Sequence, residues 1–492
     1  MKRLNWTQDL RDRLGLTHVF NRVQTASPLS RKQLLQAEYF TPADRDRRLK
    51  YFQYMKRLKD VVTSSESGLG QTYSDLSDLR DLSEIAAKLS GGLELDVTDL
   101  FLLKKHVTLE QRLLCRPDLL KAAGIRLHDH AKILALLSGT RAADIQAPVR
   151  LALSDFDDGE LKKQRATAAA LQRRLADSVE PDLSDLFRQI EAAEAVVRAS
   201  EGKLLAWLTK NLLPYGESLL ANQQKLVDLD LMLAKLRLAR ETGNEAVSLD
   251  SHRLAFVAMS HPEEANRLRA GGSRFTALDL SVRAGVTVIQ GANMSGKSVA
   301  LNTAFLNALL VNLGFYPFAK SARVPLFDTY LWIGDVRGDR QQGLSTFGAE
   351  VYQIRRAVDL AAEGPSLIVI DEPFRGTNPG EGQWLASGLA AYADTLPSFT
   401  LIATHYTLCG EARYRRYRSG DIDVPAGLTD DYELAVRQLS ERVDYQLKDI
   451  TGETAVPQKA MAIAGWLGLQ EGILAQAARF KLDALENMNG KT

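Results

Sequence analysis

Three things are scarce in this chain: cysteine, an excess of either charge, and long apolar runs. The 492 residues include two cysteines, Cys115 and Cys409, which excludes a disulfide framework, and neither stands at metal-ligand spacing. Lys and Arg number 62 against 61 Asp and Glu, so any contact with a polyanion must come from a local patch. No run of 18 apolar residues and no apolar signal core occur, which favours a cytoplasmic protein without a membrane span.

The chain divides into two unlike halves. Residues 1–250 carry apolar side chains at helical spacing, and those from 160 to about 242 read as two or three long, charged, amphipathic helices. From about residue 251 short apolar runs alternate with helices, and the last 60 residues return to helix. The long helices are interpreted as levers or coiled arms, or alternatively as a bundle that packs on itself.

These patterns predict an α+β multidomain protein. A mostly α-helical core at 1–159 and lever or arm helices at 160–250 would precede an α/β domain at 251–430. A helical C-terminal segment would occupy 431–492.

A phosphate-binding loop is the most informative motif. Residues 291–298 read Gly-Ala-Asn-Met-Ser-Gly-Lys-Ser and fit G-x-x-x-x-G-K-[ST]. The apolar run at 286–290 predicts a buried strand, and residues 299–310 predict a helix. This strand–loop–helix setting is the context that the motif requires.

Each residue type in this phosphate loop has a chemical reason. Gly291 and Gly296 let consecutive backbone N–H groups wrap the phosphates, and the following helix presents its N-terminus to the same charge. Lys297 supplies a positive charge to the β- and γ-phosphates, and the Ser298 hydroxyl can bind Mg²⁺. The loop therefore predicts binding of Mg²⁺ with ATP.

A second motif follows the apolar run at 367–370, which predicts another buried strand. Asp371 and Glu372 come directly after it. Ligands of α/β folds bind at the carboxyl ends of the strands, so both carboxylates are expected at the edge that carries the phosphate loop. Asp371 would hold Mg²⁺, and Glu372 would orient or deprotonate the attacking water. A structural salt-bridged pair is the alternative.

A third apolar run, at 400–403, leads to Thr404 and His405. An imidazole at the end of this strand can sense the γ-phosphate or position water, which makes His405 a candidate catalytic residue. A histidine satisfied within the core is the structural alternative.

Taken together, these motifs resemble the MutS family of ATPases in residue identity, order and spacing over about residues 255–410. The segments that carry the resemblance are Ser260–Pro262, Arg274–Phe275, the phosphate loop with its Asn293-Met294 pair, the Ser-Thr-Phe-x-x-Glu segment at 345–350, the Asp-Glu-x-x-Arg-Gly-Thr run at 371–377 and Ala-Thr-His at 403–405. Residues 226–233 are similar to the core and lever helices of the family, and 460–469 to its terminal dimerisation helices.

The resemblance implies an ABC-type ATPase that works as a homodimer or heterodimer with two composite sites. Ser345 would reach across to the γ-phosphate of the partner, Phe275 would lie against the adenine, and Glu372 would be the catalytic carboxylate. The implied nucleotide-binding set is Gly291, Asn293, Met294, Ser295, Gly296, Lys297, Ser298 and Phe275.

No segment resembles the mismatch-recognition and connector domains of the family, and residues 371–378 resemble a divergent MutS-related branch. Some members of that branch are similar to proteins linked to reactivating cobalamin-dependent aminomutases. Three hypotheses stay open: a clamp on DNA in repair or recombination, an ATP-dependent reactivase of such a metabolic enzyme, and a nucleotide-gated protein scaffold.

Two basic clusters with interleaved aromatic residues are candidate nucleic-acid patches. They are Arg45–Lys50, followed by Tyr51, Phe52 and Tyr54, and Arg413–Arg418. A solvated helix face or a protein contact is the commoner role of such clusters.

Overall fold

The computed structural model describes residues 1–64, 66–139, 144–156, 159–178, 182–243, 247–249, 252–292, 294–334, 346–410, 414–420, 423, 442–450 and 459–489. The chain forms two compact units. An α/β unit contains residues 1–22, 37–49 and 238–492, and a helical unit contains residues 23–36 and 50–237. The four-segment division predicted from the sequence stays a prediction.

The helical unit is built around a core of leucine and isoleucine side chains. Leu100, Leu103 and Val107 form one buried face and pack with Leu208 and Leu212. The helices of this unit are α3 (Pro28–Gln36), α4 (Arg45–Ser64, which begins in the α/β unit), α5 (Glu66–Leu76), α6 (Ser83–Ser90), α7 (Val97–Leu114), α8 (Pro117–Ala122), α9 (Ala131–Ser138), α10 (Glu160–Asp177), α11 (Ser184–Leu212) and α12 (Gly216–Thr242, which ends in the α/β unit).

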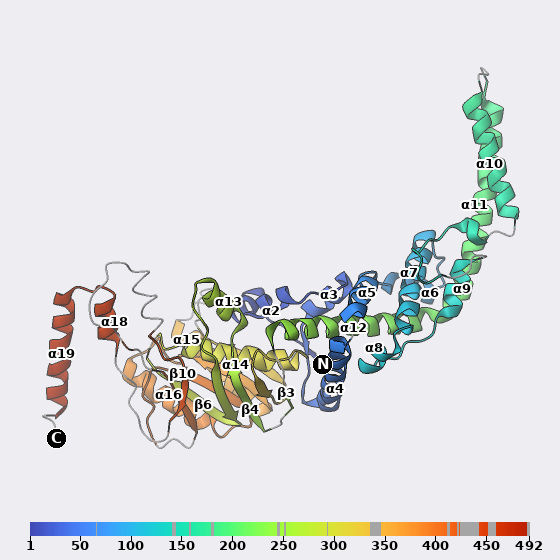
Figure 1. Ribbon diagram of the computed structural model, residues 1–492. Helices are drawn as coiled ribbons and strands as arrows, with labels where there is room; N and C mark the ends of the chain where they lie inside the picture. The colour runs from blue at the N-terminus through green and yellow to red at the C-terminus, as the bar shows by residue number, and fades with distance from the viewer. Residues whose placement is uncertain are drawn as a thin grey trace. The chain divides into compact units, whose positions relative to one another are not determined.

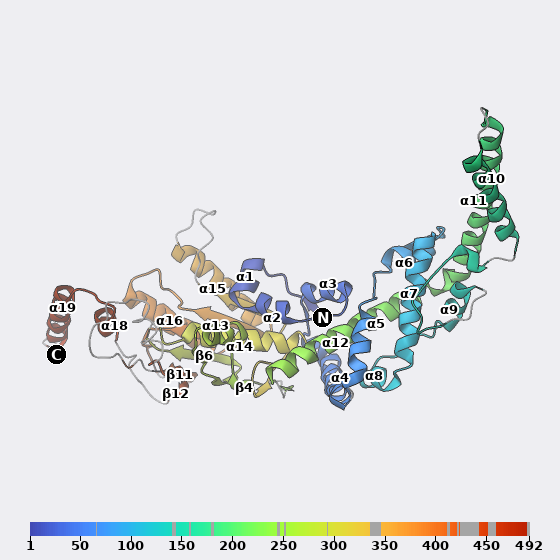
Figure 2. The same cartoon turned by 45° about the horizontal axis from the view of Figure 1, so that its top comes forward.

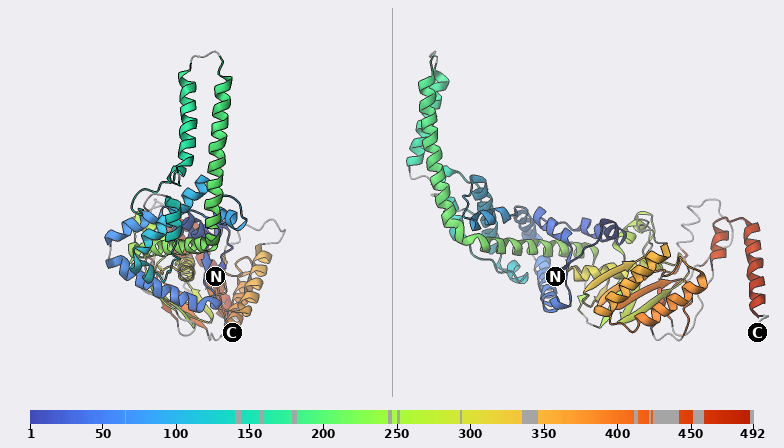
Figure 3. Two further views of the ribbon diagram at one scale, coloured as in Figure 1. Left: turned by 90° about the vertical axis from the view of Figure 1, so that its right-hand side faces the viewer. Right: turned by 180° about the vertical axis from the view of Figure 1, so that it is seen from behind.

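Helices α10 and α11 form a long antiparallel pair, called here the arm hairpin, which Figures 1 and 3 show as two rods side by side. Buried side chains are sparse along most of it: Leu161 and Ala168 on α10, and Ile190 near the start of α11. The other buried residues of α11, Leu208, Thr209 and Leu212, lie at its end. Arg165 bridges the two helices through Glu201 at 2.7 Å. The long charged helices predicted between residues 160 and 242 are confirmed.

The α/β unit contains a six-stranded sheet in the order β12-β11-β6-β10-β9-β8. All neighbours are parallel except β12, which pairs antiparallel with β11. The strands are β6 (Gly285–Gln290), β8 (Thr329–Ile333), β9 (Ser366–Asp371), β10 (Phe399–Thr404), β11 (Arg415–Ser419) and β12 (Leu447–Asp449). Every residue of β6 and β10 is buried, as expected for central parallel strands covered on both faces.

Helices cover both faces of this sheet (Figures 1 and 3). Helix α14 (Lys297–Asn312) lies on one face, and thirteen of its sixteen residues are buried. Helices α15 (Thr346–Glu363) and α16 (Pro379–Ala393) lie on the other, where Ile354 and Leu389 pack with Val286 and Ile402. A helix buried on all sides fixes its own N-terminus firmly, and in α14 this terminus is the end of the phosphate loop.

A second sheet, β3-β7-β4-β5, also contacts α14. Its strands are β3 (Val247–Ser248), β4 (Arg253–Met259), β5 (Leu278–Arg283) and β7 (Ser321–Arg323). Helix α13 (Pro262–Ala270) follows β4, and helices α18 (Ala460–Trp466) and α19 (Glu471–Asn489) end the chain (Figure 2).

The first 22 residues pack against the α/β elements rather than within the helical unit. They contain β1 (Lys2–Arg3), paired with β2 (Glu38–Tyr39), then α1 (Gln8–Arg13) and α2 (Leu16–Arg22). Trp6 stacks on Phe305 of α14 with ring centroids 5.7 Å apart. These residues therefore belong to the core that supports the phosphate loop, which their helical periodicity did not reveal.

The predicted fold class is confirmed, since a helical N-terminal half precedes an α/β region with mixed sheets and a helical end. Among the described residues, no helix combines the length and hydrophobicity that crossing a bilayer requires.

Candidate active site

Three adjacent strands of the six-stranded sheet end at the same edge and bring the predicted motifs together. Strand β10 pairs with β6 on one side and with β9 on the other. The phosphate loop follows β6, His405 follows β10, and Asp371 and Glu372 end β9. In-register parallel pairing places these chain-distant groups side by side, at the sheet edge where α/β folds bind ligands.

The two phosphate-loop glycines have distinct geometric reasons. A Cβ on Gly291 would collide with the hydroxyl of Ser419 at the end of β11. Gly296 caps α14 with φ 84°, in the left-handed region, and a Cβ there would lie 2.8 Å from the Tyr445 ring. A side chain at either position would force the backbone away from its observed path.

The remaining loop residues differ in exposure. Ser295 is buried, and its hydroxyl donates to the carbonyl of Ala292 at 2.7 Å, which closes the turn. Met294 adopts a left-handed φ of 68° and is 53% exposed. Asn293 lies outside the described residues, as does Ser345.

Lys297 is the buried cation of the site. Its Nζ donates to the carbonyl oxygens of Gly291 and Ala292, both at 3.0 Å, and lies 3.0 Å from Glu372 Oε1. The ammonium therefore joins the phosphate loop to the carboxylate at the end of β9. An ammonium so placed attracts the negative charge of a phosphate chain.

Glu372 is held between two positively polarised groups. His405 Nδ1 hydrogen-bonds Glu372 Oε2 on the side away from Lys297. Burial raises the pKa of the Glu372 carboxyl, but the hydrogen bond from His405 and the charge of Lys297 outweigh it and hold the pKa below its ordinary value. Glu372 is therefore a carboxylate at neutral pH, which is the form a general base needs.

Asp371 and Ser298 fit a Mg²⁺ ion. The Ser298 hydroxyl hydrogen-bonds the Asp371 carboxyl, whose Oδ1 atom is buried and has no hydrogen-bond partner among the described residues. Burial raises the pKa of Asp371, and the charge of Glu372 adds to that effect. A hard cation takes hydroxyl and carboxylate oxygens as ligands and would satisfy the unpaired Oδ1 atom.

A cavity of about 430 Å³ adjoins the phosphate loop at Gly296 and Val299. Phe275, Val443 and Tyr445 line it, and the contact of Phe275 with adenine that the family resemblance implies stays a prediction. Aromatic walls of this kind suit a planar base. No motif surrounds Val443 or Tyr445, so the sequence offered no signal for them.

Some arginines of the two basic clusters have structural partners, while Arg45, Arg47 and Lys50 of the first cluster are exposed, so its role as a nucleic-acid patch stays a prediction. Arg48 is 2% exposed and donates to the carbonyls of Val324 and Pro325, while burial lowers its pKa to about 10. In the second cluster Arg415 pairs with Asp449 at 2.6 Å, and Arg416 is buried within β11. Arg413 lies outside the described residues.

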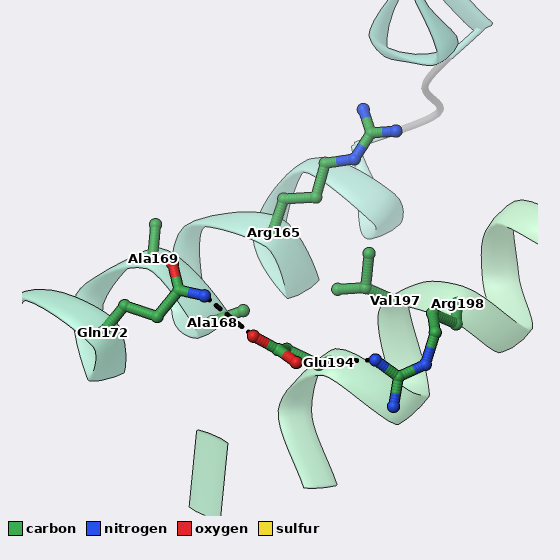
Figure 4. A pocket seen from close by; sticks show the side chains of 7 residues that line it. All are labelled: Arg165, Ala168, Ala169, Gln172, Glu194, Val197 and Arg198. Carbon is green, nitrogen blue, oxygen red and sulfur yellow. Dashed lines mark hydrogen bonds and ion pairs between the residues drawn. The ribbon is translucent and has the colours of Figure 1, made fainter. Parts of the chain in front are cut away.

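A smaller cavity of about 220 Å³ lies within the arm hairpin (Figure 4). Glu194 accepts hydrogen bonds from Gln172 at 2.8 Å and Arg198 at 3.4 Å across its floor. Because the polar lining groups bind one another, this cavity is a gap between paired helices.

An α/β nucleotide-binding domain is defined by the strand ends together with the phosphate loop and the paired carboxylates. Residues 287–479 match the protein family described as MutS domain V, which is an ATPase domain. The C-terminal half of the chain is therefore similar to MutS domain V and distantly similar to the matching parts of MutS and MutS2.

Three relatives show how distant the sequence similarity is. The chain is 31% identical to the DNA mismatch repair protein MutS of Thermus caldophilus, over 46% of this chain and 27% of that protein. It is 33% identical to Endonuclease MutS2 of Thermomicrobium roseum, over 46% of this chain and 29% of that protein. It is 28% identical to the DNA mismatch repair protein MutS of Anaeromyxobacter sp., over 63% of this chain and 35% of that protein. The chain thus matches about a third or less of the length of these relatives.

Proposed function

We propose that this protein hydrolyses ATP with Mg²⁺ and uses the reaction to drive a dimeric clamp on DNA. The observation that carries the enzymatic part is the joining of Lys297, Glu372 and His405 at three adjacent strand ends. A buried cation, a partly buried carboxylate and an imidazole within contact distance suit phosphoryl transfer to water.

In this proposal the chain positions ATP before any chemistry occurs. The phosphates lie in the phosphate loop, where Lys297 exchanges its loop carbonyl partners for phosphate oxygens. Phe275 and Tyr445 hold the base in the adjoining cavity. Ser298 and Asp371 would hold Mg²⁺, which supplies charge neutralisation at the β- and γ-phosphates when bound.

The reaction proposed is in-line attack of water on the γ-phosphate. The water oxygen forms a bond to phosphorus while the bond to the bridging oxygen of ADP breaks. Glu372 orients the water through Oε1 or Oε2 and takes its proton, and His405 stabilises the carboxylate in that position. Ser345 is proposed to complete the site of a partner subunit, which makes the protein a dimer.

The DNA part of the proposal rests on the relatives and on the arm hairpin. The relatives named above are DNA mismatch repair proteins and an endonuclease. Exposed basic residues lie along α10 and α11 and supply contacts for phosphates: Lys162, Lys163, Arg173, Arg174, Arg188 and Lys203. Closure of paired ATPase domains would move these helices as rigid levers.

Hydrolysis of ATP by the purified chain tests the enzymatic part. We expect phosphate release that requires Mg²⁺ and stops when EDTA removes it, while binding of a fluorescent ATP analogue weakens by less. Phosphate release that EDTA leaves unchanged contradicts the roles given to Ser298 and Asp371. Tight analogue binding with no turnover in Mg²⁺ supports the scaffold hypothesis instead.

Affinity capture tests what the clamp holds. The Glu372→Gln protein, captured in the presence of ATP, should retain DNA, and its affinity for DNA should fall linearly on a log–log scale with salt. No DNA binding at low salt contradicts the proposal. Recovery of a cobalamin-dependent enzyme would favour the reactivase hypothesis.

His405→Ala is expected to shift the pH dependence of hydrolysis. The His405 hydrogen bond lowers the pKa of Glu372, so its loss raises that pKa. The acidic limb of the kcat/KM profile then moves to higher pH, because more of the base is protonated at a given pH. A hydrogen bond to a charged group is worth roughly 1.5–3 kcal/mol, so kcat should fall about tenfold or more.

The exposed His252 provides the matched control for this experiment. His252→Ala should keep the acidic limb and kcat of the unaltered protein. An unmoved acidic limb in His405→Ala would show that His405 does not act on Glu372.

A further inference from the structure

The turn that carries Glu372 is conformationally strained. Glu372 has φ 54° and Phe374 has φ 61°, both in the left-handed region that non-glycine residues seldom adopt. The Glu372 N–H donates to the Ala403 carbonyl of β10 at 2.9 Å, which ties the start of the turn to the sheet. Such a backbone persists only where surrounding groups hold it.

The far side of the turn is held by Glu350 of α15. Glu350 Oε1 accepts from the Phe374 N–H at 2.6 Å, and the Arg375 N–H also donates to this carboxyl. The Phe374 carbonyl accepts from the Tyr406 hydroxyl at 3.3 Å. Phe347, one turn before Glu350, places its ring 6.5 Å from the Phe374 ring.

These contacts separate Glu350 from nucleotide binding. The phosphate loop is set by β6 and α14, whereas Glu350 acts on the turn after β9 from the opposite face of the sheet. If the turn relaxes, the Glu372 carboxylate leaves its place between Lys297 and His405 while the loop keeps its own geometry.

We infer that Glu350 is a positioning residue that holds the Glu372 carboxylate in its reactive orientation by accepting from the Phe374 and Arg375 N–H groups. The inference rests on the proposed ATP hydrolysis. The length of the side chain that carries the acceptor oxygen is decisive, because the two N–H groups that donate to it are uncharged backbone groups. The negative charge of the carboxylate is secondary.

Two conservative variants separate the effect of side-chain length at position 350 from the effect of its charge. Glu350→Gln keeps the side-chain length and one carbonyl acceptor but loses the charge. Glu350→Asp keeps the charge but withdraws the acceptor by one carbon–carbon bond. We expect kcat of Glu350→Gln within about threefold of the unaltered protein and kcat of Glu350→Asp at least tenfold lower.

The affinity for a fluorescent ATP analogue should change less than twofold in both variants. The exposed Glu363 at the end of the same helix is the matched control, and Glu363→Asp should leave kcat unchanged. Thermal melting of each variant reports whether the fold is kept.

A second measurement tests whether Glu350 acts on hydrolysis by positioning Glu372. In single-turnover experiments, Glu350→Asp should lower the rate of the Glu372→Gln protein by less than twofold, since the group that it positions is already disabled. A full tenfold further loss in that background would overturn the inference.

Other outcomes also decide the matter. Equal or greater activity of Glu350→Asp than of Glu350→Gln contradicts the argument from side-chain length, and loss of ATP affinity in parallel with kcat shows a merely structural role. If the unaltered protein hydrolyses no ATP, the proposed function fails and the inference with it. Turnover in the unaltered protein with a reversed order of variants overturns the inference alone.

Discussion

Lys297→Ala is expected to abolish most ATP hydrolysis, lowering kcat/KM for ATP by about 10²–10³-fold or more. Lys297 is the buried cation that contacts both the phosphate loop and Glu372. Its loss removes charge stabilisation both from the bound phosphates and from the transition state. Both analogue affinity and kcat should therefore fall, as measured by fluorescence titration and phosphate release.

Lys320, an exposed lysine that follows α14, is the control for charge alone. Lys320→Ala should bind and hydrolyse ATP as the unaltered protein does. Retained turnover in a folded Lys297→Ala protein would place the nucleotide elsewhere and contradict the proposed site.

Glu372→Gln is expected to separate binding from chemistry. Glutamine keeps the size of the side chain and an oxygen for His405 but cannot take a proton from water. General-base catalysis contributes about 10²–10⁴-fold, so kcat should fall by that order while ATP affinity is kept or improved. Stable ATP-bound dimers should then accumulate, which light scattering or sedimentation can measure.

Glu381, an exposed carboxylate on α16, gives the matched substitution. Glu381→Gln should leave turnover and oligomeric state unchanged. Undiminished hydrolysis by Glu372→Gln would remove Glu372 from the role of base and leave Asp371 as the carboxylate to test next.

Lys297→Ala and Glu372→Gln therefore have different expected signatures. The first loses affinity and rate together, whereas the second loses rate alone. The His405→Ala variant lies between them, because it keeps the base and changes its pKa.

Much of the candidate site could be assembled from the sequence because its parts are local. An apolar run followed by the phosphate loop specifies a strand, a turn and a helix N-terminus within a few residues. The same holds for β9 with Asp371 and Glu372 and for β10 with His405. The roles of these side chains, and those of Asn293 and Ser345, stay predictions until the variants are measured.

Residue type alone did not show which basic side chains of the two clusters are buried. The basic stretch at Arg45–Lys50 has the composition of a nucleic-acid patch, yet Arg48 donates to backbone carbonyls inside the α/β unit. In the second cluster the alternation of Arg and Tyr belongs to strand β11, where Tyr417 is buried. Local composition cannot distinguish a solvated cation from one that satisfies buried acceptors.

By itself, the sequence determined the class of fold, the phosphate loop and the two motifs that face it, because local hydrophobic periodicity and glycine placement specify such elements. Only the tertiary structure decided that Tyr445 lines the cavity beside the phosphate loop, that residues 1–22 pack on α14, and that Glu350 accepts from the turn bearing Glu372. Each of these contacts joins residues far apart in the chain, and their pairing depends on strand order and helix packing, which no short segment encodes.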